Sequence, residues 1–326
     1  MFSLWKPSVF QGDLNRSGYF EGWYFKSVSR DEDAACAVIP GVSLPREREK
    51  AHAFVQFSRA GEGKSSFFRY RLSEFSADRK TFAVAIGNNR FSLDGIRLDI
   101  DQGGESLRAE LSFRGIHPWP VTRLSPGAMG WYAFVPGMEC YHDVLSFDHA
   151  IEGWCEKDGM RTDFTGGKGY IEKDWGKSMP GSWIWMQSNH FDEPEASFSG
   201  SIAKIPWFGR YFTGYLFGFY FRGKVYRFTS YTGARVSDLK VDQGLVSFTI
   251  EDADSRMEVR GARAEGARLM APREGDMSVR IMETLGSSID LLFSRKKSRE
   301  IIYSGTGRNA GLEYVGDVRE LADRLA

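Results

Sequence analysis

Three carboxylates of this 326-residue chain stand among large aromatic side chains, in two separate segments. Residues 18–26 read GYFEGWYFK and contain Glu21, whereas residues 169–176 read GYIEKDWG and contain Glu172 and Asp174. Burial among apolar rings disfavours the charged form of a carboxyl group, so such a group keeps its proton to higher pH. Aromatic faces also attract a cation that forms beside them. The two segments therefore predict acid chemistry on an apolar substrate.

The first segment places its carboxylate between two rings if it is extended. Alternation along a strand puts Tyr19, Glu21 and Trp23 on one face. If this face points inward, burial raises the pKa of Glu21 and keeps a proton available near neutral pH. The alternative is a core strand in which Glu21 is paired with a lysine or an arginine.

The second segment brings two carboxylates to the same face. Tyr170, Glu172 and Asp174 alternate with Lys173, which points the other way in a strand, and Trp175 ends the run. Two carboxylates within hydrogen-bonding reach tend to hold one proton between them, because both cannot ionise cheaply. This segment is therefore the stronger candidate for an acid.

A third group follows shortly after. Trp183, Trp185, Gln187 and Asn189 alternate onto one face, so two rings are followed by two neutral hydrogen-bonding groups. The two amides suit recognition of a hydroxyl or carbonyl group in an apolar pocket. The alternative is that they satisfy buried backbone groups.

Other chemistries lack the required patterns. His142 and His149 lie among acidic residues, but their spacing fits neither HExxH nor a facial triad, so we expect no metal. The chain has no nucleophile elbow, phosphate-binding loop or dinucleotide fingerprint, and we expect no cofactor.

Composition narrows the class of partner. Lysine plus arginine equals aspartate plus glutamate at 43 each, so no net field draws in nucleic acid. Three widely spaced cysteines indicate reduced thiols in a cytoplasmic protein. The most apolar run, residues 211–221, is about half as long as a membrane-spanning helix, although peripheral contact with lipid remains compatible with it. The oligomeric state cannot be read from these patterns.

The elements that must position these residues are mostly strands. Aromatic and β-branched runs, separated by turn residues about every ten positions, predict an all-β protein. The best-defined strands are residues 51–57, 66–72, 82–86, 107–113, 198–202, 215–221, 224–229, 245–251 and 257–262. Residues 315–325 alone have clear helical periodicity and predict a short C-terminal helix.

The two halves have a similar texture, as in a loose duplication. Each begins with a Gly-Tyr-x-Glu segment and continues through hairpins of similar length. This pattern predicts two consecutive antiparallel β-barrel or sandwich domains, residues 1–163 and 164–326, each beginning near one aromatic–acidic segment.

Four segments together resemble the tocopherol cyclase family. They are residues 10–12 (FQG), 19–26 (YFEGWYFK), 169–176 (GYIEKDWG) and 180–189 (PGSWIWMQSN). The resemblance implies two lipocalin-like, or calycin-type, β-domains, and the GWY step at residues 22–24 also resembles the first-strand signature of lipocalins.

Family members of known activity close a chromanol ring on a prenylated quinol, without a cofactor or metal. The resemblance, with chemical suitability, implies that Asp174 or Glu172 is the acid and that Glu21 is its partner or the base. The same reasoning assigns substrate binding to Tyr19, Trp23, Trp175, Trp183, Trp185, Gln187 and Asn189, with the tryptophans around the cation and the two amides on the quinol oxygens.

Two other functions fit the same residues. A lipocalin-like protein can carry an apolar isoprenoid or lipid without converting it, and a related enzyme can add water to the cation as a hydratase. Because the first motif begins so near Met1, we expect a bacterial cytoplasmic relative that acts on a hydrophobic small molecule.

Overall fold

The computed structural model describes residues 4–207, 209–323 and 325. In this part of the chain the regular structure is almost entirely antiparallel strand, arranged in a 12-stranded and a 10-stranded sheet. The exceptions are the short 3-10 helices Arg48–Lys50, Leu72–Glu74 and Gly130–Phe134 and the helix α1, Arg319–Ala322. The all-β prediction is therefore confirmed, and the strands expected from the sequence are present.

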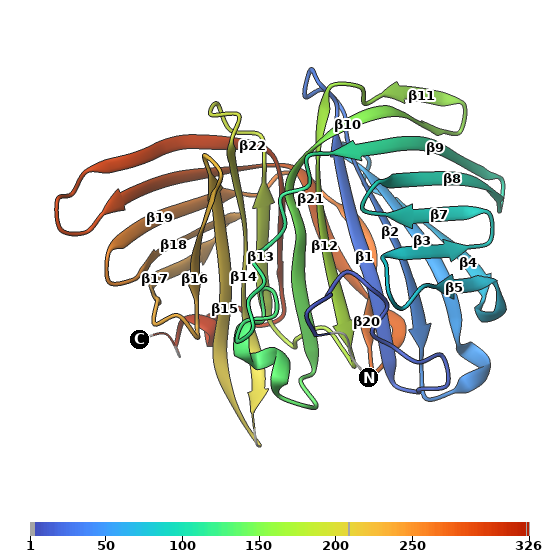
Figure 1. The fold of residues 1–326 in the computed structure, drawn as a ribbon, viewed down its shortest axis with the longest axis horizontal. Helices are drawn as coiled ribbons and strands as arrows, with labels where there is room; N and C mark the ends of the chain where they lie inside the picture. The colour runs from blue at the N-terminus through green and yellow to red at the C-terminus, as the bar shows by residue number, and fades with distance from the viewer. Residues whose placement is uncertain (1–3, 208, 324, 326) are drawn as a thin grey trace. The chain divides into compact units, whose positions relative to one another are not determined.

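The first sheet contains both aromatic–acidic segments, as neighbours (Figure 1). Its strand order is β4 (Ser65–Arg71), β3 (His52–Arg59), β2 (Ala35–Leu44), β1 (Tyr19–Val28), β12 (Gly167–Gly176), β10 (Cys140–Lys157), β9 (Glu105–Arg114), β8 (Gly95–Gln102), β7 (Asn89–Ser92), β6 (Ala83–Ile86) and β5 (Phe75–Ala77), with β11 (Met160–Asp163) paired to β10.

The second sheet is built from the rest of the chain. Its order is β16 (Lys224–Thr229), β15 (Arg210–Phe221), β14 (Ala196–Trp207), β13 (Trp183–Ser188), β22 (Ile301–Val315), β21 (Asp276–Arg295), β19 (Ser255–Ala262), β18 (Leu245–Glu251) and β17 (Arg235–Asp242), with β20 (Ala267–Arg273) paired to β21. The apolar run at residues 211–221 is strand β15, as expected.

Each sheet has its own apolar core on one face. In β9 the residues Leu107, Ala109, Leu111 and Phe113 are buried and alternate with exposed polar residues. The core of the second sheet is formed in the same way by residues such as Phe217. In strands such as β9, period-two alternation fixes which face is buried, whereas β1 and β13 are buried on both faces.

The contacts divide the chain into two compact units. One contains residues 1–179 and 269–280, and the other contains residues 180–268 and 281–326. The segment 269–280 joins the first unit through hydrogen bonds such as Met270 N–H to Gln56 Oε1 at 2.7 Å. The division into domains 1–163 and 164–326 stays a prediction, because contacts within the folded chain do not test which parts fold independently.

Two other expectations need correction. The segment 169–176 is not the first strand of a second sheet, because β12 pairs with β1 along its length. The two similar segments are instead neighbouring strands, each buried over most of its length. The short C-terminal helix is present, but its bounds differ from residues 315–325: β22 continues to Val315, α1 covers Arg319–Ala322, and residue 324 lies outside the described residues.

A search of the described residues for a helix long and apolar enough to cross a membrane finds none.

Candidate active site

The pairing of β1 with β12 sorts the predicted catalytic residues onto two faces of one sheet. Trp23 lies opposite Lys173, and Tyr24 lies opposite Glu172. Trp23 belongs to the apolar core of this sheet, so Lys173 shares the core face. Glu172 therefore lies on the reverse face. Alternation predicted this separation within β12, but only the pairing shows that Glu21 is on the side of Lys173.

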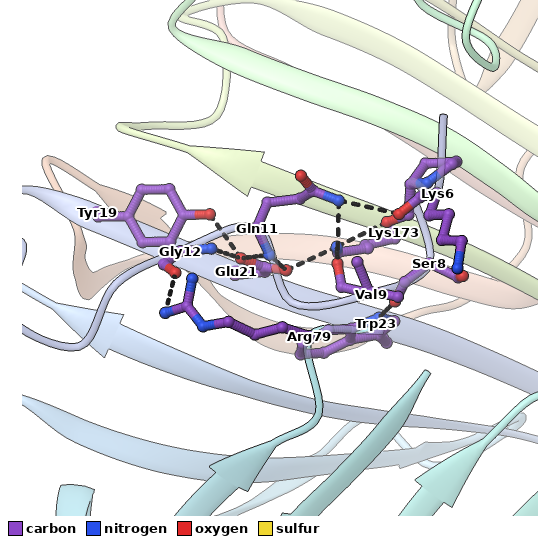
Figure 2. Close-up of polar contacts among 11 residues, drawn as sticks. Lys6, Ser8, Val9, Gln11, Gly12, Tyr19, Glu21, Trp23, Arg79 and Lys173 are labelled. Carbon is purple, nitrogen blue, oxygen red and sulfur yellow. Dashed lines mark hydrogen bonds and ion pairs between the residues drawn. The ribbon is translucent and has the colours of Figure 1, made fainter. Parts of the chain in front are cut away.

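Glu21 is a fully buried carboxylate whose oxygens are engaged on several sides (Figure 2). Lys173 Nζ lies 2.6 Å from Oε1. The backbone N–H groups of Gln11 and Gly12 both donate at 2.9 Å, and the Tyr19 hydroxyl donates at 2.5 Å. This is the paired arrangement named as the alternative above. The role of Glu21 as an acid or base stays a prediction.

Lys173 is also fully buried and holds the N-terminal segment in place. Its ammonium donates to Pro7 O at 2.7 Å and to Val9 O at 2.6 Å (Figure 2). Burial lowers the pKa of Lys173, although the Glu21 carboxylate acts in the opposite direction. Together Glu21 and Lys173 fix residues 7–12 against the sheet.

The rings expected to stabilise a substrate cation on this face already surround a cation of the protein. The Lys173 ammonium lies 4.9 Å from the ring centroid of Trp23 and 4.7 Å from that of Trp175. Burial raises the pKa of Tyr19 well above its usual value, and the charge of Glu21 adds to this effect. These side chains form one buried electrostatic unit on the core face.

The reverse face gathers a histidine between the two other carboxylates. His142 Nδ1 lies 3.0 Å from Asp174 Oδ1, and His142 Nε2 lies 3.9 Å from Glu172 Oε2. The Tyr170 hydroxyl donates to Glu172 Oε2 at 2.5 Å. Asp174 keeps 23% of its side chain exposed, against 7% for Glu172. We call His142, Glu172 and Asp174 the acid–base cluster.

His142 carries a proton in this cluster at neutral pH. Burial lowers its pKa, but the charges of Asp174, Glu172 and Asp143 and the hydrogen bond to Asp174 outweigh burial and raise the pKa to about 9. The imidazolium therefore separates two carboxylates that were expected to share a proton directly.

The sequence analysis missed the part that His142 plays. His142 was considered only as a metal ligand, with neighbours on its own strand. Its partners lie on β12, where it pairs with Asp174 across the β10–β12 ladder. No local pattern reveals such pairing. The one signal in the sequence was that a segment with acidic residues at alternate positions, now β12, follows shortly after a segment that contains histidines, now β10.

Asp143 supports the cluster from the core face. It lies opposite Lys173 in the β10–β12 ladder and accepts the Ala128 N–H at 3.1 Å. Burial raises its pKa to about 7, while His142 and the Ala128 N–H lower it. Asp143 is therefore a carboxyl group that titrates near neutrality, next to the imidazolium in sequence.

The acid–base cluster contains the kinds of side chain that bind a divalent metal ion, one histidine and two carboxylates. One ligand atom from each of its three residues lies within 4.8 Å of the others. The hydrogen bond from His142 to Asp174 accounts for the same arrangement with a proton in place of a metal. The expectation that no metal is bound stays a prediction, which chelation tests directly.

The third predicted group belongs to the second unit. Trp183, Trp185 and Gln187 share one face of β13, because Ile184 and Met186 point into the core of that sheet. Asn189 follows the strand and its Oδ1 lies 2.9 Å from His190 Nδ1.

A buried carboxylate that the sequence analysis did not single out lies beside this third group. Trp183 Nε1 donates to Glu313 Oε2 at 3.0 Å. The third group is thus coherent within its own sheet, and substrate binding by it stays a prediction.

Solved structures similar to this chain define the class of fold. A crystal structure of CghA has a TM-score of 0.58 at 12% identity and covers 92% of this chain and 89% of that chain. A putative AttH from Nitrosomonas europaea has a TM-score of 0.52 at 11% identity and covers 91% of this chain and 92% of that chain. The protein is thus an all-β, lipocalin-like protein, as expected.

Sequence comparison then identifies the family. The model of the tocopherol cyclase-like family matches residues 91–316, so the chain belongs to this family. The chloroplastic tocopherol cyclase of Zea mays is 28% identical over 223 residues, or 65% of this chain and 47% of the maize protein. A probable chloroplastic tocopherol cyclase of Oryza sativa subsp. japonica matches with the same identity and coverage. The chain spans about half the length of these curated relatives.

Proposed function

We propose that this protein catalyses the proton-initiated cyclisation of a prenylated quinol to a chromanol, or the same step on a related isoprenoid. The observation that carries the proposal is the acid–base cluster, in which an imidazolium is hydrogen-bonded to a partly exposed carboxylate. Membership of the tocopherol cyclase-like family supports the class of reaction. The ligand is accordingly a hydrophobic small molecule.

The reaction needs one group that gives a proton and receives one back. Protonation of the trisubstituted alkene leaves a tertiary cation, which the phenol oxygen attacks to form the new C–O bond. The phenolic proton then returns to the protein, so substrate and product are isomers. Exclusion of water prevents hydration of the cation. General acid–base catalysis by one positioned group can serve both proton transfers.

Asp174 is the carboxylate best placed to act on a substrate, because it is the more exposed of the pair. An apolar substrate that covers the cluster removes water, and low polarity disfavours an imidazolium beside a carboxylate. The proton on His142 Nδ1 then moves along the 3.0 Å hydrogen bond to Asp174. This produces a neutral carboxylic acid, the group that protonates the alkene.

Glu172 and nearby rings complete the proposed site. Glu172 is held by the Tyr170 hydroxyl and keeps negative charge near His142, which favours return of the proton after ring closure. The rings of Tyr24 and Tyr170 lie 6.5 Å apart on this face. They are better placed for the substrate cation than Trp23 and Trp175, whose faces meet Lys173. Each ring contributes about 2 kcal/mol or more to cation binding when water is excluded.

Turnover of a prenylated hydroquinone by the purified full chain tests the proposal. Liquid chromatography with mass spectrometry should detect a chromanol of the same mass as the substrate. Asp174→Asn and His142→Gln should each lower kcat by about 100-fold or more, the usual contribution of general acid catalysis. Arg222→Gln, which alters an exposed ion pair of the other unit, is the matched control and should keep the rate.

The same experiment separates the rival functions. A carrier would bind the quinol without turnover and would keep binding in Asp174→Asn. A hydratase would give a product heavier by one water. Activity that disappears with a chelator and returns with a divalent ion would show that the cluster works as a metal site. Each of these outcomes would contradict the proposed mechanism.

A further inference from the structure

A cluster of exposed apolar side chains marks one part of the first unit. Five of the nine large apolar side chains that are exposed in the described residues belong to it: Trp5, Val121, Leu124, Trp131 and Phe134. We call these five residues the apolar tip. The proposed reaction makes no use of them.

The apolar tip is one continuous feature, because Trp5 joins its parts. Trp5 Nε1 donates to Arg123 O at 3.3 Å, and the Trp5 and Phe134 rings have centroids 5.8 Å apart. Leu124 is 81% exposed at the end of a turn in which Thr122 N–H donates to Ser125 O at 2.9 Å. Figure 1 shows the chain that leads from β9 to β10 as a green excursion with a helical coil.

The excursion that carries the tip is firmly attached to the sheet. Trp119 is buried and its ring stacks on that of Phe147, with centroids 5.7 Å apart, while its backbone N–H donates to Val144 O at 3.0 Å. Further along, Ala128 donates to Asp143 and the Tyr141 hydroxyl donates to Val135 O at 2.8 Å. The backbone that carries the apolar residues is therefore fixed by these contacts, so their exposure is a property of the folded structure.

The charge of the excursion fits a phospholipid surface. Residues 115–138 of the excursion contain no aspartate or glutamate, its last residue is Glu139, and Arg123 adjoins Leu124 of the tip. Lys6 adjoins Trp5, and its ammonium reaches Lys80 O at 3.1 Å. Tryptophan and phenylalanine, with basic groups beside them, favour the interface between lipid headgroups and acyl chains. Large exposed apolar clusters on soluble folds mark interaction sites.

We propose that the apolar tip inserts into the surface of a lipid bilayer and seats the first unit there as a peripheral membrane protein. Leu124 and Phe134 enter the acyl boundary, while Arg123 and Lys6 meet phosphate groups. The excursion leads directly into β10, which carries His142 two residues after its start at Cys140. Membrane seating would thus place β10 close to the phase in which apolar isoprenoids dissolve.

Flotation of the full chain with vesicles that contain no quinol tests this proposal independently of catalysis. Vesicles of phosphatidylcholine with about 30% phosphatidylglycerol should carry the protein, because anionic lipid adds attraction for Arg123 and Lys6. Leu124→Asp combined with Phe134→Ser should lower the partition coefficient by about tenfold or more, since both apolar contacts are lost. Arg123→Glu should weaken binding to these vesicles more than to pure phosphatidylcholine.

Met160→Asp is the matched control, because Met160 is an exposed apolar residue of β11 outside the tip. It should leave vesicle binding unchanged. No binding by the unaltered protein, or equal binding by the Leu124→Asp, Phe134→Ser variant, would overturn the proposal. Sedimentation velocity without vesicles supplies the remaining outcome. If the substitutions only dissociate an oligomer, the tip binds a second copy of the chain, and the membrane proposal is wrong.

Discussion

His142 lies between two carboxylates that differ in exposure, and this asymmetry gives the residues separate roles. Asp174 is hydrogen-bonded and reachable, whereas Glu172 is more buried and is held by Tyr170. The sequence placed Tyr170, Glu172 and Asp174 on one face correctly, because alternation is local. It could not find His142, because the β10–β12 ladder pairs residues far apart in the chain, and local patterns do not reveal which strands pair.

The raised pKa of His142 makes stability depend on pH. A histidine whose pKa is higher in the folded than in the unfolded state stabilises the folded state. For His142 this stabilisation is fully present below about pH 6.5 and is lost as pH rises through about 9. The difference in unfolding free energy between the protein and His142→Gln should therefore shrink by roughly 3 kcal/mol over this range. Urea unfolding at several pH values measures it.

His149→Gln is the control for this prediction. Burial lowers the pKa of His149 to about 3, so it is neutral in both states above about pH 7. Its replacement should shift stability by a constant amount between pH 7 and 9. If His142→Gln behaves in the same way, the His142 charge in the acid–base cluster is wrongly assigned.

The buried pair of Glu21 and Lys173 should show strong coupling. Lys173→Met leaves a buried carboxylate without its cation and should lower the unfolding free energy by about 3–5 kcal/mol. Glu21→Gln together with Lys173→Met should cost clearly less than the sum of the single changes. Arg295→Met, which breaks an exposed pair with Glu300, should cost under about 1 kcal/mol. Additive effects in the double variant would contradict a coupled buried pair.

At the scale of elements, β12 is the strand that the site depends on. It carries Lys173 on the core face and Glu172 with Asp174 on the reverse face, between β1 and β10. Its strand character followed from the sequence, but its pairing with β1 in the same sheet did not. Both aromatic–acidic segments have the pattern of a strand buried on two faces, and such a pattern does not reveal which strands pair.

A substitution at Gly169 tests how closely β12 must approach β10. A methyl group at Gly169 would overlap the His149 imidazole, which is itself buried. Gly169→Ala should therefore cost about 1–3 kcal/mol of unfolding free energy, the usual effect of overpacking, and should lower turnover by shifting β12. Gly181→Ala, where added atoms meet nothing, is the control and should be close to neutral. Full stability in Gly169→Ala would show that β12 tolerates displacement.

At the scale of the whole molecule, the aromatic content of 14% is explained mainly by the cores of the two sheets. Most rings fill the two sheet cores, as Phe25 and Phe113 do in one unit and Phe217 and Phe248 do in the other. The sequence could not separate these from rings at a site, because both kinds alternate along strands. The lipocalin-like architecture and the family were predictable, whereas the division of site residues between faces and units required the three-dimensional pairing.

The central claim is that ring closure begins with transfer of a proton from the protein to the alkene. Turnover of a prenylated hydroquinone in D2O, followed by mass spectrometry and NMR of the chromanol, tests it most directly. The account predicts one non-exchangeable deuterium per molecule, on the former alkene carbon next to the new quaternary centre, and almost no product from Asp174→Asn. Chromanol without deuterium at that carbon would contradict the account.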